Sequence, residues 1–430
     1  MAAAKPAWHG SRSTVARGGE APRATAGAGH VHVGEEIEAL TAFEGRAAGT
    51  DAERRAADHL ARRLRSLGRE GELEPTVVRP RFARTHALHA AVAVVGSAVS
   101  TFSPPAGAAL VLLAAFSAYG DLTGRFFLFR RLTAKRASQN VVSTEGGEKP
   151  GVLVLLAHHD AAHTGGVFRP RAVERRAKIG ARIRRPFGLS EVFFLALIGL
   201  LACCLVRLVL PDATLLGLIQ LVPTAALIAA VPLLLDISFG AIVPGANDNA
   251  SGVATVLALV ARYSARFEHF DVWCVFTGAE ESQALGMREW VRRHGSELDP
   301  GATLFLDLDK VGAGAVHYAR KEGLVFPLTY DARLLSLCDE IASAHAVADD
   351  EAEVPGARPY VARTTGDAAV ARAKGLRAIS ISCLNELGYA PRYHAPGDTA
   401  ERIDDEALTR AFAFSSELIE RIDAELGPEL

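Results

Sequence analysis

Five short segments of the chain combine polar side chains with the apolar runs that they follow or adjoin. They are residues 156–160 (LAHHD), 244–252 (PGANDNASG), 277–281 (TGAEE), 306–309 (LDLD) and 393–398 (YHAPGD). An α/β protein places its ligand-binding side chains at the ends of its strands, so such segments can meet at one site. Imidazole and carboxylate groups together suit zinc, or else manganese or cobalt. Neither a Ser-His-Asp order nor a setting for a cysteine nucleophile offers a competing chemistry.

Residues 244–252 form the central segment, and an apolar run from 253 to 260 follows directly. Gly245 and Gly252 bracket a tight turn, where the backbone must come close to another group. Asp248 is the only carboxylate in this segment. Taken alone, an Asp in a turn rich in Gly, Asn and Ser indicates a turn or N-cap residue. The four other polar segments favour the alternative that Asp248 binds metal.

Two pairs of nearby side chains suggest divided roles. His158 and Asp160 alternate along a strand end and so share one face, and Asp160 can accept the second ring N–H of a metal-bound His158. Glu280 and Glu281 point in different directions, so one can bind metal while the other acts as a base. A solvated helix start for the Glu pair and a surface-loop position for His394 are the alternative interpretations.

The elements that position these residues are predicted from periodicity and length. From residue 242 onward, strands and helices alternate, which predicts an α/β fold with a mostly parallel central sheet flanked by helices. The predicted strands are 271–276, 303–308 and 377–384, and the predicted helices are 253–266, 284–293, 334–344, 368–374 and 406–426.

The N-terminal part carries further signals of the same fold. Thr50 and Glu53 form a capping box at the start of a predicted helix. Residues 76–82 are a predicted strand. Residues 140–144 and 152–156 are predicted to be two strands that pair with each other around a Gly-Gly turn.

The apolar residues are concentrated in two regions that interrupt this pattern. The chain of 430 residues is 49% hydrophobic although 22% of it is charged. One region runs from 87 to 120 and is split by a Pro-Pro pair, and the other comprises 192–206 and 215–235. Each predicts an apolar helical hairpin. Crossing a bilayer takes roughly 20 residues, and no nearby amphipathic segment could cover so much apolar surface, so transmembrane hairpins are favoured over buried core helices.

These observations divide the chain into alternating parts. Residues 1–33 are predicted to be a disordered N-terminal segment. One α/β domain is assembled from three parts, and two inserted parts separate them. The domain parts are 34–85, 137–166 and 241–430, and the inserted parts are 86–136 (hairpin and basic linker) and 167–240 (basic segment and hairpin).

The distribution of basic residues predicts the orientation in the membrane. The segments that flank the hairpins on the side of the α/β domain are rich in Arg and Lys, whereas the hairpin tips carry almost no charge. Excess Lys and Arg mark the cytoplasmic side. We therefore expect a multi-pass membrane protein whose α/β domain is cytoplasmic. The five cysteines lack metal-ligand spacing, which is consistent with buried thiols of a reducing compartment.

Taken together, the five polar segments resemble the co-catalytic zinc exopeptidases of the MH clan, aminopeptidase Y family. That family includes enzymes like the bacterial leucyl aminopeptidases, and also the glutaminyl cyclases. The resemblance covers Gly45-Arg46 and the helix that follows, residues 140–165, and residue 244 to the C-terminal helix. It implies a zinc exopeptidase fold of the phosphorylase/hydrolase-like type. The apolar insertions lie outside it.

The resemblance also implies roles for individual residues around two divalent ions, most typically Zn²⁺. Asp248 would bridge the two ions. Glu281 and His394 would complete one site, and His158 and Asp309 the other. Glu280 would be the general base that takes a proton from a metal-bridging water, and Asp160 would orient His158.

The function that follows is that of a membrane-embedded aminopeptidase acting on peptide or aminoacyl substrates. Its expected partners are the substrate and the lipid bilayer, with no nucleic acid; the oligomeric state is left open. Two alternatives stand beside this one: acyl transfer on a single zinc, as in glutaminyl cyclases, and an inactive membrane scaffold with a peptidase fold. The presence of candidates for all five ligands argues against the first, and the presence of Glu280 argues against the second.

The sequence departs from the family pattern in two places. Lys310 follows Asp309 where the family usually has an apolar residue, and Asp307 occupies a neighbouring position on the same face, so either Asp could be the ligand. Residues 366–368 (GDA) resemble the Ser-Asp-His segment of the family but lack its His.

Overall fold

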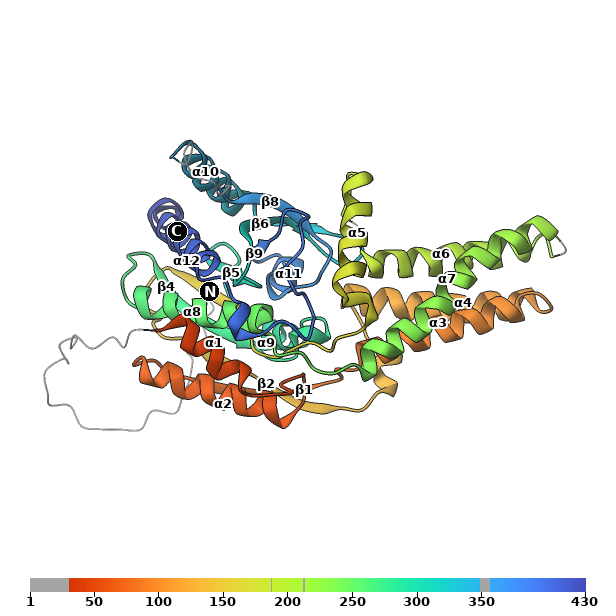
Figure 1. Cartoon of the computed structure of the whole chain (residues 1–430), viewed down its shortest axis with the longest axis horizontal. Coiled ribbons are helices and arrows are strands. Elements are labelled where there is room, and N and C mark those ends of the chain that lie inside the picture. Colours follow the sequence, from red (N-terminus) through yellow and green to blue (C-terminus); the bar gives the residue numbers. More distant parts are fainter. Residues whose placement is uncertain (1–30, 187, 212, 349–355) are drawn as a thin grey trace, which may run out of the picture.

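The computed structural model describes residues 31–186, 188–211, 213–348 and 356–430. Most of the segment that is predicted to be disordered, residues 1–30, lies outside this part, and Val33 already begins helix α1 (Val33–Thr41). Figure 1 shows an α/β body from which a bundle of long helices projects to one side.

The described strands of the α/β body form one mixed sheet in the order β1-β2-β4-β3-β5-β9-β6-β7, and β8 pairs with β6. The central strands β4, β3, β5 and β9 run parallel to one another, and antiparallel pairs lie towards both edges. The strands are β1 (Glu72–Val78), β2 (Arg136–Ser143), β3 (Gly151–His158), β4 (Phe270–Thr277), β5 (Thr303–Leu308), β6 (Ala315–Glu322), β7 (Leu328–Thr329), β8 (Arg358–Ala362) and β9 (Arg377–Leu384).

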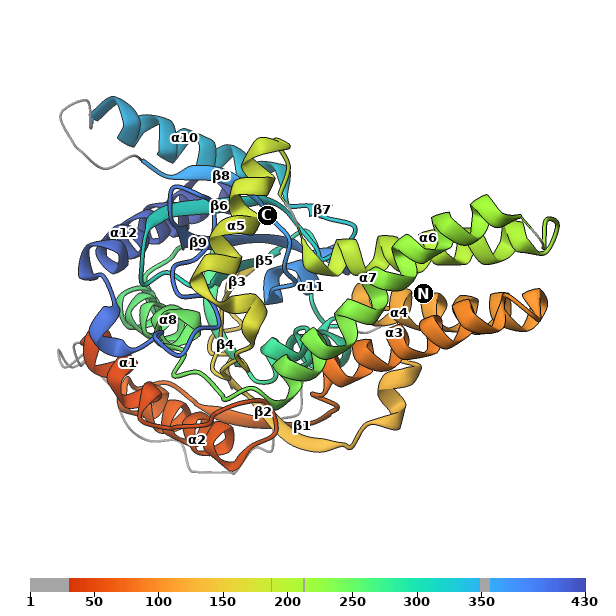
Figure 2. The same ribbon diagram turned by 45° about the vertical axis from the view of Figure 1, so that its right-hand side comes forward.

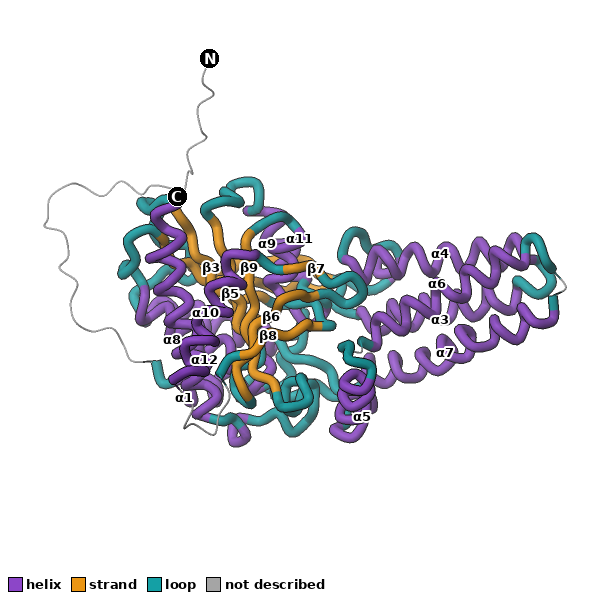
Figure 3. The backbone as a smooth tube through the Cα atoms, turned by 90° about the horizontal axis from the view of Figure 1, so that it is seen from above, coloured by secondary structure: helices purple, strands orange, loops and turns teal. Residues whose placement is uncertain are grey.

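Helices cover both faces of this sheet. In Figure 3, α8 and α12 lie on one side of the strands and α9 and α11 lie on the other. The remaining helices of the body flank this core. The helices are α2 (Asp51–Ser66), α8 (Ser251–Tyr263), α9 (Leu285–His294), α10 (Ala332–Ala348), α11 (Asp367–Ala373) and α12 (Asp405–Arg421). The predicted α/β fold with a central sheet between helices is confirmed.

Two strand predictions need correction. Residues 140–144 and 152–156 do not pair, because β4 lies between β2 and β3 and pairs with both. The connecting loop passes over the start of β4, where the N–H of Gly147 donates to Asp271 Oδ2 at 2.5 Å. The strand expected at 76–82 is β1, which ends at Val78 just before Pro80. The strand begins earlier than predicted, at Glu72, and as an edge strand it accommodates Pro75.

The two apolar regions form two helical hairpins that pack together into the projecting bundle (Figures 1 and 2). The hairpins are α3 (Phe82–Val99) with α4 (Pro104–Thr123), and α6 (Leu189–Arg207) with α7 (Thr214–Phe239). The helices α4, α6 and α7 are long and apolar enough to cross a membrane. Only 11% of the apolar window of α7 is buried within the protein. Helix α5 (Pro170–Arg182) lies across the base of the bundle.

A small polar cluster ties three helices together near the tip of the bundle. The side-chain amide of Gln220 in α7 donates to Ser97 O at 3.0 Å and to Ser100 Oγ at 3.0 Å. Gln220 Oε1 accepts from Arg207 Nε and Nη2 at 3.2 and 3.1 Å. These bonds fix α7 to α6 and to the end of α3 at the end of the bundle far from the sheet.

Candidate active site

The five predicted ligands come from different elements but meet at one edge of the sheet. His158 ends β3, Glu281 lies in the 3₁₀ turn after β4, and Asp309 directly follows β5. Asp248 lies in the turn before α8, and His394 lies in the segment between β9 and α12. All five side chains are buried or nearly so. Parallel strands bring their carboxyl ends to the same edge, and this gathers the ligands.

Asp248 occupies the centre of the cluster, and its two carboxylate oxygens face different partners. Oδ1 lies 3.2 Å from His158 Nε2, which in turn lies 3.5 Å from Asp309 Oδ1. Oδ2 lies 3.4 Å from His394 Nε2, which in turn lies 3.0 Å from Glu281 Oε2. Asp248 therefore separates two His–carboxylate pairs, His158 with Asp309 and His394 with Glu281.

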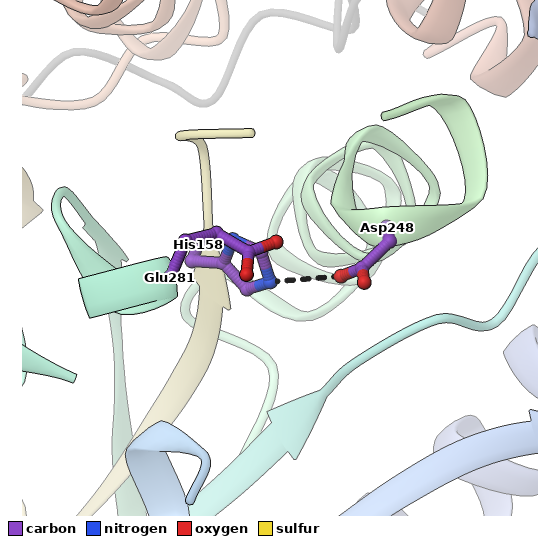
Figure 4. A group of neighbouring side chains, drawn as sticks. All are labelled: His158, Asp248 and Glu281. Atoms are coloured by element: carbon purple, nitrogen blue, oxygen red, sulfur yellow. Dashed lines mark ion pairs between the residues drawn. The ribbon is translucent and has the colours of Figure 1, made fainter. Parts of the chain in front are cut away.

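The residues of this cluster fit divalent cations. His158, Asp248 and Glu281 each offer a ligand atom within 4.8 Å of the others, and Figure 4 shows these side chains facing one another. Four buried atoms of the cluster form no hydrogen bond, although all but Glu281 Oε1 lie within ion-pair distance of another member: Asp248 Oδ1, Glu281 Oε1, Asp309 Oδ1 and His394 Nε2. Buried polar atoms in proteins normally have partners. Nitrogen and carboxylate donors in this number are the ligand set of zinc sites.

The charge of the cluster leads to the same conclusion. Burial alone would lower the pKa of His394, but the carboxylates of Glu281 and Asp248 raise it to about 9. Burial alone would raise the pKa of Asp248, but the Lys310 ammonium and the two imidazoles hold it well below its ordinary value. The cluster carries more negative than positive groups and attracts cations.

Glu280 adjoins the cluster without belonging to either pair. Its Oε2 lies 3.7 Å from His158 Nε2. Burial, followed by the nearby carboxylates of Glu281 and Asp367, raises the pKa of Glu280 well above its ordinary value, although His158 opposes this shift. A buried carboxyl group with a raised pKa, next to candidate metal ligands, is suited to take up and release a proton.

Asp160 contacts both His158 at the end of β3 and the 3₁₀ turn that carries Glu280 and Glu281. Its Oδ1 accepts from the N–H of Glu280 at 2.9 Å, and its Oδ2 accepts from the N–H of Glu281 at 3.2 Å. His158 Nδ1 lies 3.2 Å from the backbone oxygen of Asp160 and 3.5 Å from Oδ1. Asp160 thus fixes the ring of His158 and the direction of both glutamates.

Of the two aspartates that end β5, Asp309 is the one that approaches His158. Asp307 is buried on another side, facing Gly366, and burial and the charge of Asp309 raise its pKa well above the ordinary value. Lys310 forms an ion pair with Asp309, and its Nζ lies 4.0 Å from Asp248 Oδ1. Although burial alone would lower the pKa of Lys310, these two carboxylates raise it well above its ordinary value, so the ammonium stays charged.

Two residues support the Asp248 turn and received no role from the sequence. The buried guanidinium of Arg46 donates from Nη2 to Gly245 O at 2.6 Å and from Nε to His159 O at 3.0 Å. Burial lowers the pKa of Arg46 to about 10, against the raising effect of Asp398 and other carboxylates. Asp398 accepts from the N–H of Asp248 at 3.0 Å. The only signal for either residue was its place in a segment that resembles the family.

The cluster opens into a cavity of about 780 Å³. Asp248, Glu280, Glu281, Lys310 and His394 line one end of it. Apolar side chains of α5, α6 and α7 form a large part of the remaining wall, and residues 360–366 and 384–390 form much of the rest. The candidate metal ligands therefore face a space that reaches the helical bundle.

Comparisons with known proteins agree with this geometry. The model of peptidase family M28 matches residues 235–419. No curated protein sequence matches the chain. Three solved structures share the fold. They are a zinc aminopeptidase from Bacillus subtilis (13% identity, 92% of this chain and 96% of that chain, TM-score 0.52), an aminopeptidase from Aneurinibacillus sp. strain AM-1 (15%, 90% and 93%, 0.50) and a glutaminyl cyclase from Tannerella forsythia (17%, 92% and 99%, 0.50).

The shared fold and the matched segment define the class of protein: a metallopeptidase of the zinc exopeptidase type. The match to peptidase family M28 covers residues 235–419, and it confirms the resemblance that the polar segments indicate.

Proposed function

We propose that this chain is a membrane-embedded, dinuclear metal-dependent aminopeptidase. The observation that carries the proposal is the position of Asp248 between two His–carboxylate pairs, with buried atoms on both sides that form no hydrogen bond. His158 and Asp309 would hold one ion, Glu281 and His394 would hold the other, and Asp248 would hold both. When bound, two divalent ions, most typically Zn²⁺, activate a water and polarise the scissile carbonyl.

The protein's own residues handle the proton. Glu280 accepts a proton from the attacking water and returns it to the leaving amine as the amide C–N bond breaks. Asp160 keeps Glu280 aimed at the site through the backbone N–H of Glu280. Arg46 and Asp398 keep the Asp248 turn in place, so that the carboxylate stays between the two pairs.

An activity assay tests this proposal directly. The purified protein, loaded with Zn²⁺ and held in detergent or a lipid disc, should hydrolyse leucyl amides with a free amino group. N-acetyl-leucyl amides should be poor substrates, and a chelator should abolish turnover. Hydrolysis that persists after the metal has been removed would contradict the proposal.

A single-zinc acyl transfer like that of the glutaminyl cyclases is the second candidate. It is favoured by Lys310, whose ammonium lies on Asp309 and near Asp248, where it supplies positive charge to one of the two pairs. A glutaminyl cyclase from Tannerella forsythia also shares the fold. Under this alternative, the protein would hold one zinc per chain and convert N-terminal glutaminyl peptides with loss of ammonia. The aminopeptidase would instead release free amino acids.

The bundle would anchor the enzyme in the bilayer as two hairpins. Each hairpin returns the chain to the side that it left, so the segments that build the site stay together. The exposed side of α5 at the base of the bundle is basic, whereas the tips carry little charge. The exposed basic residues of this helix are Arg171, Arg175, Lys178 and Arg182. By the positive-inside rule, the base of the bundle and the α/β body are cytoplasmic.

Thiol labelling in intact cells tests this orientation. The native cysteines in the described part are buried, and a background without cysteines allows single cysteines to be placed at will. Thr144→Cys lies on the exposed surface of the α/β body, and Val209→Cys lies at the tip of the bundle, where Val209 is 79% exposed. A membrane-impermeant reagent should label only the tip. Labelling of Thr144→Cys would reverse the orientation.

A further inference from the structure

The cavity at the candidate metal ligands extends between two apolar helices of the bundle. Its wall there is made of aliphatic and aromatic side chains from α6 and α7. They include Val192, Phe193, Ala196, Ala229, Ala230 and Leu233. One continuous space thus joins an amide-hydrolysing site of the proposed kind to the surface of the helices proposed to lie in the bilayer.

The apolar character of this wall favours an alkyl chain over a peptide as the ligand. Within α6 and α7 most backbone N–H and C=O groups are bonded along the helix, although Pro223 and Pro232 leave the carbonyls four residues before them without a helical donor. The two helices therefore offer few partners to a second chain. An extended peptide would bring its own unpaired amide groups into this space, at a cost for each group. An alkyl chain has no such groups and gains free energy with every methylene that leaves water.

Part of the cavity wall on α7 is solvent-exposed. Leu233 lines the cavity and is nevertheless 46% exposed, so the wall at this helix is also part of the outer surface. The tip cluster of Arg207 and Gln220 holds α6 and α7 together at the far end. Towards the base, both helices present small side chains, such as Ala196 and Ala229, to the cavity.

We propose that the substrate is an aminoacyl amide of a long-chain amine, whose alkyl chain lies between α6 and α7. This rests on the proposed function and specifies its leaving group. Water adds to the aminoacyl carbonyl carbon, the amide C–N bond breaks, and the proton collected by Glu280 leaves on the alkylamine. The products are a free amino acid and a membrane-soluble amine.

A series of leucyl alkylamides, from ethyl to decyl, tests the proposal on protein held in lipid discs. The kcat/KM value should rise about tenfold or more across the series, because each buried methylene adds favourable transfer free energy. Ala230→Trp fills the cavity and should remove most of this gain. Ile228→Trp is the matched control, since Ile228 is 54% exposed and lies outside the cavity wall. Partitioning of the longer amides into lipid affects both variants equally.

The possible outcomes distinguish a failure of the proposed function from a failure of the proposed substrate. If no leucyl amide is hydrolysed, the proposed function fails. If the ethyl amide is hydrolysed but chain length has no effect, or if both Trp variants keep the same gain, only the present inference is overturned.

A second measurement needs no variant. A leucyl decylamide with a photoreactive diazirine at the end of its chain should label peptides from α6 and α7 of the wild-type protein on illumination. Excess unlabelled decylamide should suppress the labelling. Labelling confined to the α/β body, or labelling that competitor leaves unchanged, would overturn the proposal.

Discussion

Two buried polar clusters lie close together in this molecule, and only one of them provides hydrogen-bond partners for all of its polar side-chain atoms. At the base of the bundle, Arg130 donates from Nε and Nη2 to the two oxygens of Asp121 at 3.0 and 2.5 Å and from Nη1 to Ser282 O at 2.9 Å. All polar side-chain atoms of this ion pair have partners. In the Asp248 cluster, four buried atoms form no hydrogen bond.

The difference distinguishes a cluster with a structural role from one that is proposed to bind a ligand. Burying charges is costly unless geometry and hydrogen bonds compensate, and the Asp121–Arg130 pair has both. The carboxylates around Asp248 exceed the cationic side chains there, which supports the proposal that cations from solution compensate them. The two clusters also touch, because Ser282, which accepts from Arg130, adjoins the Glu280–Glu281 turn. The bundle therefore supports the turn that carries the candidate base.

The largest expected effect belongs to the Asp248 cluster. Glu280→Gln should retain metal and fold but lower kcat by about a hundredfold to ten-thousandfold, which is the usual contribution of a general base. The measurement is steady-state kinetics on a leucyl amide, together with metal analysis. Glu289→Gln, in α9, where Glu289 pairs with Arg292 and Arg293, is the matched control and should leave kcat unchanged. A Glu280→Gln protein with most of its activity would remove Glu280 from the mechanism.

The second-largest expected effect concerns the Asp121–Arg130 ion pair. Asp121→Ala leaves the Arg130 guanidinium buried without its counter-ion, and both side chains are only 1% exposed. Removing one partner of such a pair costs about 3–5 kcal/mol of stability. Thermal unfolding of the solubilised protein measures the loss. Asp51→Ala breaks solvent-exposed ion pairs on α2 and should leave the melting temperature almost unchanged. Equal effects in the two variants would contradict a structural role for the buried pair.

Removal of metal should distinguish the clusters directly. Zinc that binds only the folded state stabilises it by about 2.7 kcal/mol at a hundred times its dissociation constant. A chelator should therefore lower the melting temperature of the wild type and of Asp121→Ala alike. It should have little effect on Asp248→Ala, which lacks the central ligand. A chelator effect that survives in Asp248→Ala would place the stabilising ion elsewhere.

A partly exposed pair far from both clusters gives the smallest effect. His294 Nε2 in α9 lies 2.9 Å from Glu74 Oε1 in β1, and this hydrogen bond raises the pKa of His294 above its ordinary value. A raised histidine pKa contributes stability that is fully present below the unfolded value near 6.5 and is lost as the pH rises through the folded value. The contribution should be under about 1 kcal/mol.

Melting temperatures at pH 6 and pH 8.5 measure this contribution. The difference between the wild type and His294→Gln should shrink at the higher pH. A difference that stays constant across this range would show that the pair does not titrate as described.

The comparison also explains what the sequence could predict. The Asp248 cluster was predictable because three of its ligands follow or end apolar strands, Asp248 precedes an apolar helix, and the side-chain types indicate their chemistry. His158, Glu281 and Asp309 follow three neighbouring strands, so the α/β pattern alone brings them to one edge. The two hairpins were predictable for the same reason, since a long apolar run is a local signal.

The supporting contacts were not predictable, because they join distant parts of the chain. Arg46 reaches Gly245 across 199 positions, and Asp398 reaches Asp248 across 150. The mistaken pairing of β2 with β3 has the same cause: β4, which separates them, begins only at Phe270. Short connections favour the pairing of neighbours, and only the complete sheet reveals an inserted strand.

The content of bound metal tests the central claim most directly. Purified wild-type protein, equilibrated with Zn²⁺ and freed of excess ions, should contain two zinc ions per chain by elemental analysis, and Asp248→Ala should lose both. In a structure of the loaded protein, the ions should lie roughly 3.5 Å apart on either side of Asp248. One zinc per chain would favour the single-metal alternative, and the absence of tightly bound metal would contradict the account.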